Sequence, residues 1–152
     1  DLVNRSVLTT RRFDALKVWM TTKVLGRERL ARYIDATCAL ACEVAAAVRA
    51  RPALALVHAP DELSTVLFRV RAKRRDGEPA ASHAAREDAL NARVHDDLFR
   101  RGVAVLGTTR VHGRTTLKLT LLNPAATVSD YAAILEAAER CGSAAMNCSC
   151  SA

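Results

Sequence analysis

The sequence has few aromatic residues and no long apolar segment. Phe, Tyr and Trp make up 4% of its 152 residues. The longest uncharged internal run lies between Lys118 and Asp130, far short of the roughly 20 apolar residues that a membrane-spanning helix needs. No signal-peptide pattern opens the chain. We therefore expect no membrane association, and a cytoplasmic location.

The usual signatures of a self-contained active site are also missing. Cys141, Cys148 and Cys150 lack the paired spacing and accompanying His of a zinc site, so we expect no bound metal. The four His residues are far apart in sequence, and no Ser or Cys nucleophile motif or glycine-rich phosphate loop accompanies them. Cys38 and Cys42 would share a helix face, where we expect buried thiols rather than a disulfide. A self-contained hydrolase is disfavoured.

The composition is that of a globular protein. Half of the residues are hydrophobic and 26% are charged, enough to bury a sizeable core. By the guide of roughly 100 to 200 residues per domain, the chain is one domain or part of one. Its 23 basic and 16 acidic residues give a net charge of +7. The basic residues are scattered and do not interleave with aromatics, so nucleic acid is not an expected partner.

Hydrophobic periodicity predicts two helices at the start of the chain. A stripe at helical spacing belongs to the first, which Gly26 ends as a C-terminal cap: Phe13, Leu16, Met20 and Val24. The second begins near Arg27, stops before Pro52, and carries one face made of Leu30, Ile34, Cys38, Ala41, Ala45 and Val48.

The rest of the pattern alternates strands and helices. It predicts strands at 54–58 and 64–71, an exposed loop at 73–82, a helix at 83–101, a hairpin of strands 103–110 and 115–122, and a helix that Ser129 caps and Gly142 closes. Gly113 supplies the positive φ that the hairpin turn needs. Two helices followed by ββαββα indicate an α+β fold with an antiparallel sheet.

Two sets of residues are candidates for binding an anion. Side chains alternate along a strand, so Lys118 points away from the face of Leu117, Leu119 and Leu121. It either lies on a solvated sheet face or reaches into a cleft to bind a carboxylate or phosphate. The second set is Thr9, Thr10, Arg11 and Arg12 at a helix start, where free amides, hydroxyls and the helix dipole favour anions, although an ordinary capped helix is the commoner case.

Several ordered blocks resemble the group II pyridoxal-phosphate-dependent amino-acid decarboxylases, which act on glutamate, aromatic amino acids, lysine and 2,4-diaminobutyrate. The blocks, spread over about residues 2–140, are TTRRFDALKVW at 9–19 followed by Leu25-Gly26, LSTVLFR at 63–69, RRGVAVLG at 100–107 and TLKLTLLNP at 116–124. Within the family, the combination looks most like the diaminobutyrate decarboxylases and the lysine-type enzymes of hydroxamate siderophore pathways.

The resemblance implies the C-terminal portion of a homodimeric fold type I enzyme. Residues 1–51 would be a helical segment linking from a preceding large domain, residues 52–142 the small C-terminal domain, and residues 143–152 a flexible tail. Lys118 falls where related decarboxylases carry an Arg, which in the glutamate enzymes is understood to hold the substrate carboxylate; Lys keeps the charge but loses the bidentate fork. Thr10 and Arg11 match a stretch near the cofactor phosphate.

The resemblance also implies what the chain lacks. In the family the cofactor lysine follows a His, whereas no lysine of this sequence does. We therefore expect no catalytic residue here, and no decarboxylation by the chain alone. The leading hypothesis is the C-terminal part of a decarboxylase acting on diaminobutyrate or lysine. The alternative is a non-catalytic interaction module derived from the same small domain, and a nucleic-acid binder is a distant third.

Overall fold

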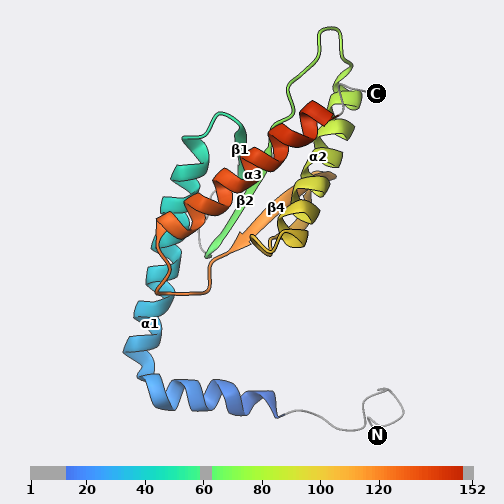
Figure 1. Ribbon diagram of the computed structural model, residues 1–152. Helices are drawn as coiled ribbons and strands as arrows, with labels where there is room; N and C mark the ends of the chain where they lie inside the picture. The colour runs from blue at the N-terminus through green and yellow to red at the C-terminus, as the bar shows by residue number, and fades with distance from the viewer. Residues whose placement is uncertain (1–12, 59–62, 149–152) are drawn as a thin grey trace, which may run out of the picture. The chain divides into compact units, whose positions relative to one another are not determined.

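The computed structural model describes residues 13–58 and 63–148, the last three by their backbone only. The elements are α1 (Asp14–Arg49), β1 (Leu54–His58), β2 (Thr65–Val70), α2 (Ala80–Arg100), β3 (Gly107–Val111), β4 (Arg114–Thr120) and α3 (Val128–Cys148) (Figure 1). The chain divides into two compact units, Asp1–Asp35 and Ala36–Ala152. The architecture is α+β with an antiparallel sheet, as predicted.

The first unit contains the N-terminal part of α1. Gly26 has φ 72° and ψ 164°, a non-helical conformation inside α1, in a region of backbone space that residues with a β-carbon avoid. The first helix is thus interrupted at Gly26, as predicted, and a second helical stretch follows directly within α1. Leu25 is half-buried, whereas six large apolar side chains before this break are exposed by 40% or more of their surface: Phe13, Leu16, Val18, Trp19, Met20 and Val24.

The second unit is built on a four-stranded sheet in the order β1-β2-β4-β3, in which every neighbouring pair is antiparallel. The β3–β4 hairpin turns through His112 and Gly113, both with positive φ (50° and 75°). Two successive positive φ angles match the right-handed twist of the flanking strands, which confirms the turn predicted at Gly113. Strand β3 begins only at Gly107, because Val103 and Val105 are exposed and unpaired with β4.

Helices α2 and α3 pack on one face of this sheet (Figure 1). The alternating residues Val66, Phe68 and Val70 of β2 are at most 1% exposed and form one apolar cluster with Leu98 of α2 and Leu135 of α3. The second half of α1 joins the same cluster through Leu40, Ala41, Val44, Ala45 and Val48. Burial of this apolar surface is the main stabilising contribution to the second unit.

Helix α3 differs from its prediction at both ends. Thr127, not Ser129, precedes the first turn: its backbone N–H donates to Asp130 Oδ2 at 2.8 Å, and its hydroxyl donates to the same oxygen at 2.9 Å. These bonds hold the pKa of Asp130 below its usual value. Gly142 does not close the helix. It lies where a β-carbon would come within 2.6 Å of Val70 Cγ1, so it is a helix–sheet contact.

The helix faces explain the cysteines. The buried residues of α1 include Ala41, Val44, Ala45 and Val48; Cys38 lies at the edge of that face, almost in line with Ala45, and Cys42 lies farther around the helix. Cys42 is exposed and Cys38 is half-buried, so the expectation of two buried thiols was wrong. Both thiols are free, and Cys141 of α3 is the buried one.

Candidate functional site on the open face of the sheet

Strand β4 separates the apolar core from a polar surface. Leu117 and Leu119 are at most 5% exposed and belong to the core, whereas Lys118 between them is half-buried. The alternation predicted from the sequence is therefore confirmed, and Lys118 leaves the core. The side chains that share its face by strand register include Thr65, Leu67 and Arg69 of β2, Gly107 and Thr109 of β3, and Thr116, Lys118 and Thr120 of β4. We call this set the Lys118 face.

Lys118 lies between a leucine and a glycine. Its Cα partners are Leu67 on β2 and Gly107 on β3. A β-carbon built on Gly107 would lie 2.8 Å from Lys118 Cε, so the lysine side chain lies across β3 in the space that this glycine leaves open. Within residues 13–58 and 63–148, the Lys118 ammonium has no hydrogen-bond or ion-pair partner. It is thus a half-buried cation that an external anion could pair.

The second cation of the Lys118 face is fixed. Arg69 Nε donates to Thr116 Oγ1 at 3.1 Å and to the Thr115 carbonyl at 3.2 Å, and its Nη2 donates to the Val111 carbonyl at 3.3 Å. Because these acceptors are neutral, no carboxylate compensates the charge of Arg69. Arg69 lies two residues beyond Leu67, the partner of Lys118, so it is a diagonal neighbour of Lys118 on the same face, and no acidic residue belongs to that face. The pair makes the face electropositive.

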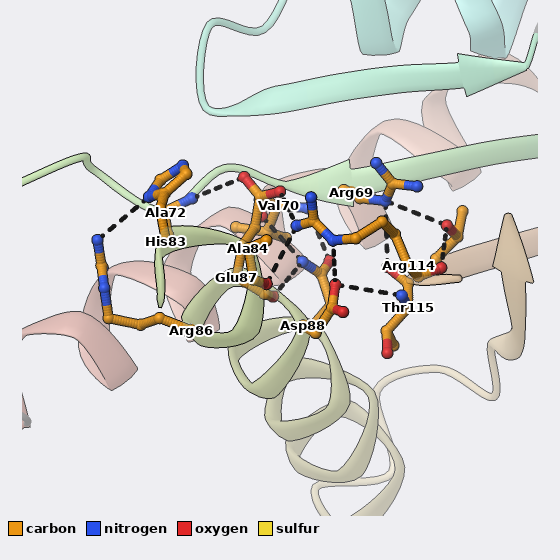
Figure 2. Close-up of polar contacts among 12 residues, drawn as sticks. Arg69, Val70, Ala72, His83, Ala84, Arg86, Glu87, Asp88, Arg114 and Thr115 are labelled. Atoms are coloured by element: carbon orange, nitrogen blue, oxygen red, sulfur yellow. Dashed lines mark hydrogen bonds and ion pairs between the residues drawn. The ribbon is translucent and has the colours of Figure 1, made fainter. Parts of the chain in front are cut away.

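A separate polar cluster fastens α2 to the strands (Figure 2). Figure 2 shows Arg114 between Glu87 and Asp88, to which it donates at 2.8 Å each. The Asp88 bond, with desolvation opposing it, raises the pKa of Arg114 above its usual value. Asp88 also accepts the Thr115 backbone N–H, and Glu87 accepts that of Ala72. These carboxylates are occupied by protein donors, so the cluster is structural and unsuited to acid–base chemistry.

Asn91 completes the attachment of α2. It is fully buried, its Oδ1 accepts the Val70 backbone N–H at 2.8 Å, and its Nδ2 donates to the Val70 carbonyl at 3.0 Å and the Glu87 carbonyl at 2.8 Å. The β2–β4 pairing ends at Phe68, so this amide takes the place of a neighbouring strand. Nothing in our sequence analysis identified it, although a polar residue in register with Val94 and Leu98 was a usable signal.

The loop before α2 is held by one carboxylate. Glu78 accepts two hydrogen bonds from Arg86, at 2.9 and 2.7 Å, and one from the Arg75 backbone N–H. The Arg86 bonds are the largest cause that lowers the pKa of Glu78 to about 2, with the neighbouring His83 adding to the effect. Each of these groups lies on the loop or on α2, away from the Lys118 face.

The lysines differ in their exposure. Lys17, Lys23 and Lys73 are exposed, and Lys118 is half-buried on the sheet. Thr10 and Arg11, the predicted phosphate-side contacts, lie outside the described residues. The described part of the chain contains a groove of about 410 Å³ at the β1 edge, lined by Arg49, Leu54, Leu56, Val57, His58 and Arg71, and no lysine belongs to it.

The part of the chain that the structure covers holds neither a metal-ligand cluster nor a membrane-spanning helix. No three His, Cys, Asp or Glu side chains there come together as metal ligands would. No helix there combines the length and apolarity needed to cross a bilayer.

Comparison with known proteins finds relatives along nearly the whole chain. It is 41% identical over 144 residues to the L-2,4-diaminobutyrate decarboxylase of Acinetobacter baumannii, covering 92% of this chain and 27% of that protein. The enzyme of the same name from Rhizobium meliloti is 42% identical over 137 residues, covering 90% and 26%. The chain thus spans about a quarter of these relatives. It matches no protein-family model.

A solved structure gives the same picture. The glutamate decarboxylase domain of diaminobutyrate-pyruvate transaminase and L-2,4-diaminobutyrate decarboxylase from Vibrio parahaemolyticus superposes with a TM-score of 0.74 at 38% identity. The match covers 90% of this chain and 27% of that one. Sequence and backbone therefore indicate the same relationship.

Proposed function

The chain belongs to the group II pyridoxal-phosphate-dependent amino-acid decarboxylases, as a C-terminal portion, and we propose that it serves a decarboxylase whose substrate is L-2,4-diaminobutyrate. The observation that carries the substrate is the identity of 41–42% to two enzymes of that name. Lysine is the second substrate to test, and it would connect the enzyme with hydroxamate siderophore pathways.

Within that enzyme, Lys118 binds the substrate carboxylate. Its ammonium is half-buried, carries no partner among the described residues, and lies beside Arg69 on a face without acidic groups. A charge-assisted hydrogen bond from this ammonium would fix the carboxylate that is to be lost. The bound cofactor would take up the electrons of the broken bond, and the lysine that holds it would lie in the preceding domain. The chain by itself is inactive.

Three further properties follow from this assignment. The enzyme is a homodimer, because the family's sites lie between two subunits, and it acts in the cytoplasm. Thr10 and Arg11 contact the cofactor phosphate. The exposed stripe of the first unit, from Phe13 to Val24, is covered by other protein surface in the assembled enzyme.

The direct test replaces Lys118 in the full-length enzyme. Lys118→Ala raises KM for 2,4-diaminobutyrate about tenfold or more, the usual value of a charge-assisted bond, while the melting temperature stays near that of the wild type. Lys118→Arg restores part of the affinity because it keeps the charge. Lys73→Ala replaces an exposed lysine in the loop before α2. This matched control changes neither KM nor the melting temperature. Unchanged kinetics with lost stability would contradict the carboxylate role.

The second candidate is an interaction module without catalysis, and the exposed stripe of the first unit is the observation that favours it. Intact-mass measurement of the natural product, followed by borohydride reduction and peptide mapping, separates the two. A longer protein labelled at a lysine upstream of this chain supports the decarboxylase. A protein of 152 residues that carries no label and pairs through the stripe supports the module.

A further inference from the structure

Gly107 faces Lys118 across the β3–β4 ladder, and its missing side chain has a specific consequence. A β-carbon at this position would meet Lys118 Cε at 2.8 Å, Lys118 Cβ at 3.5 Å and the Lys118 carbonyl oxygen at 3.6 Å. Only the first of these separations is shorter than an ordinary contact. The space above Gly107 is therefore filled by the far end of the Lys118 side chain.

The backbone does not require glycine here. Gly107 is absent from the residues with positive φ, which are Gly26, Gly77, Gly102, His112 and Gly113. An L-residue could adopt the β3 conformation without strain, and glycine weakens a strand because it adds entropy to the unfolded chain and packs no side chain. Conformation and strand stability both disfavour glycine at this position, so the contact with Lys118 is the remaining reason for it.

We infer that Gly107 is a positioning residue for Lys118: its bare backbone lets the lysine lie across β3 and so sets where the ammonium meets the substrate carboxylate. This inference rests on the proposed function. On the β2 side, the partner of Lys118 is Leu67, which has a side chain where Gly107 has none. Glycine on one side and leucine on the other together select one side for the lysine side chain.

The test is a double-mutant cycle in the full-length enzyme, with 2,4-diaminobutyrate as substrate. Gly107→Ala forces Lys118 Cε to move, and it raises KM severalfold with little change in kcat. In the Lys118→Ala background the same substitution has no further effect, because the displaced group is gone. Thr108→Ala, the next residue of β3 and exposed, is the control and leaves KM unchanged in both backgrounds.

The outcomes separate this inference from the proposed function. If Lys118→Ala leaves KM unchanged, the carboxylate role fails and the positioning role fails with it. If Lys118→Ala raises KM but Gly107→Ala does not, or raises it equally in both backgrounds, only the positioning role is overturned. A melting temperature lowered equally in both backgrounds also overturns it, since the new methyl group would then collide with something other than Lys118.

Discussion

The two units of the chain use similar apolar residues with opposite results. In the second unit, Phe68 and its alternating neighbours on β2 are at most 1% exposed. In the first, Met20 is 51% exposed and Val24 is 78% exposed. Both patterns are regular, with period 2 in the strand and a helical stripe in α1. The difference shows that periodicity identifies which face is apolar but not what covers it.

The two units also differ in how much apolar surface they bury. The second unit has a core to which its sheet and all three helices contribute, so its fold has its own apolar driving force. Large exposed apolar surfaces mark interaction sites, and the stripe of the first unit is such a surface. This is what we expect of a segment that packs against the rest of a decarboxylase.

Truncating one aromatic residue in each unit should give the largest difference in stability between the two units. Phe68→Ala removes a fully buried ring and lowers the free energy of unfolding of the 152-residue chain by about 3–5 kcal/mol. Trp19→Ala changes it by no more than about 0.5 kcal/mol, because an exposed residue loses little packing. Urea titration followed by circular dichroism measures both. An equal loss for Trp19→Ala would mean that the stripe is packed within the chain.

Sequence reasoning predicted local features well. The order of elements, the turn at Gly113 and the inward face of β4 all depend on near neighbours in the chain, and the structure has all three. The errors came from tertiary contacts. Gly142 matches a helix stop, yet the close approach of Val70 explains why a glycine stands there. Cys42 was predicted to share a buried helix face with Cys38, yet its side chain is exposed.

The candidate site also combines features that near neighbours in the chain determine with features that depend on tertiary contacts. Alternation alone predicted that Lys118 leaves the core, and resemblance gave it a role. The pairing of Lys118 with Gly107 depends on strand register, which no single segment specifies. The hydrogen bonds of Arg69 to the hairpin likewise join residues more than 40 positions apart. A sequence indicates which groups can bind an anion, whereas register decides which of them are neighbours.

A second prediction tests how the second unit is held together where strand pairing ends. Asn91→Ala leaves the Val70 N–H and C=O without their partners, and an unsatisfied buried group costs about 1–3 kcal/mol. We expect a loss of about 3 kcal/mol in urea titration. Asn123→Ala is the control, since this exposed amide accepts one bond from the Ala125 backbone, and it should cost less than about 1 kcal/mol. Equal losses would show that the Asn91 bonds contribute nothing special.

The smallest expected effect concerns pH and compares one carboxylate from each unit. The pKa of Glu78 is lowered from 4.5 to about 2 in the folded chain by its bonds to Arg86. The unfolded chain therefore binds more protons between these values, so the stabilisation by Glu78 is present above pH 4.5 and is lost as the pH falls to about 2. Glu78→Gln should be less stable than the wild type near pH 6 and equally stable near pH 2. Glu28→Gln, at an exposed position of α1, should follow the wild type throughout. Urea midpoints measured at a series of pH values test this, and a Glu78→Gln deficit that persists at the lowest pH would assign the effect to packing of the loop rather than to the ionised carboxylate.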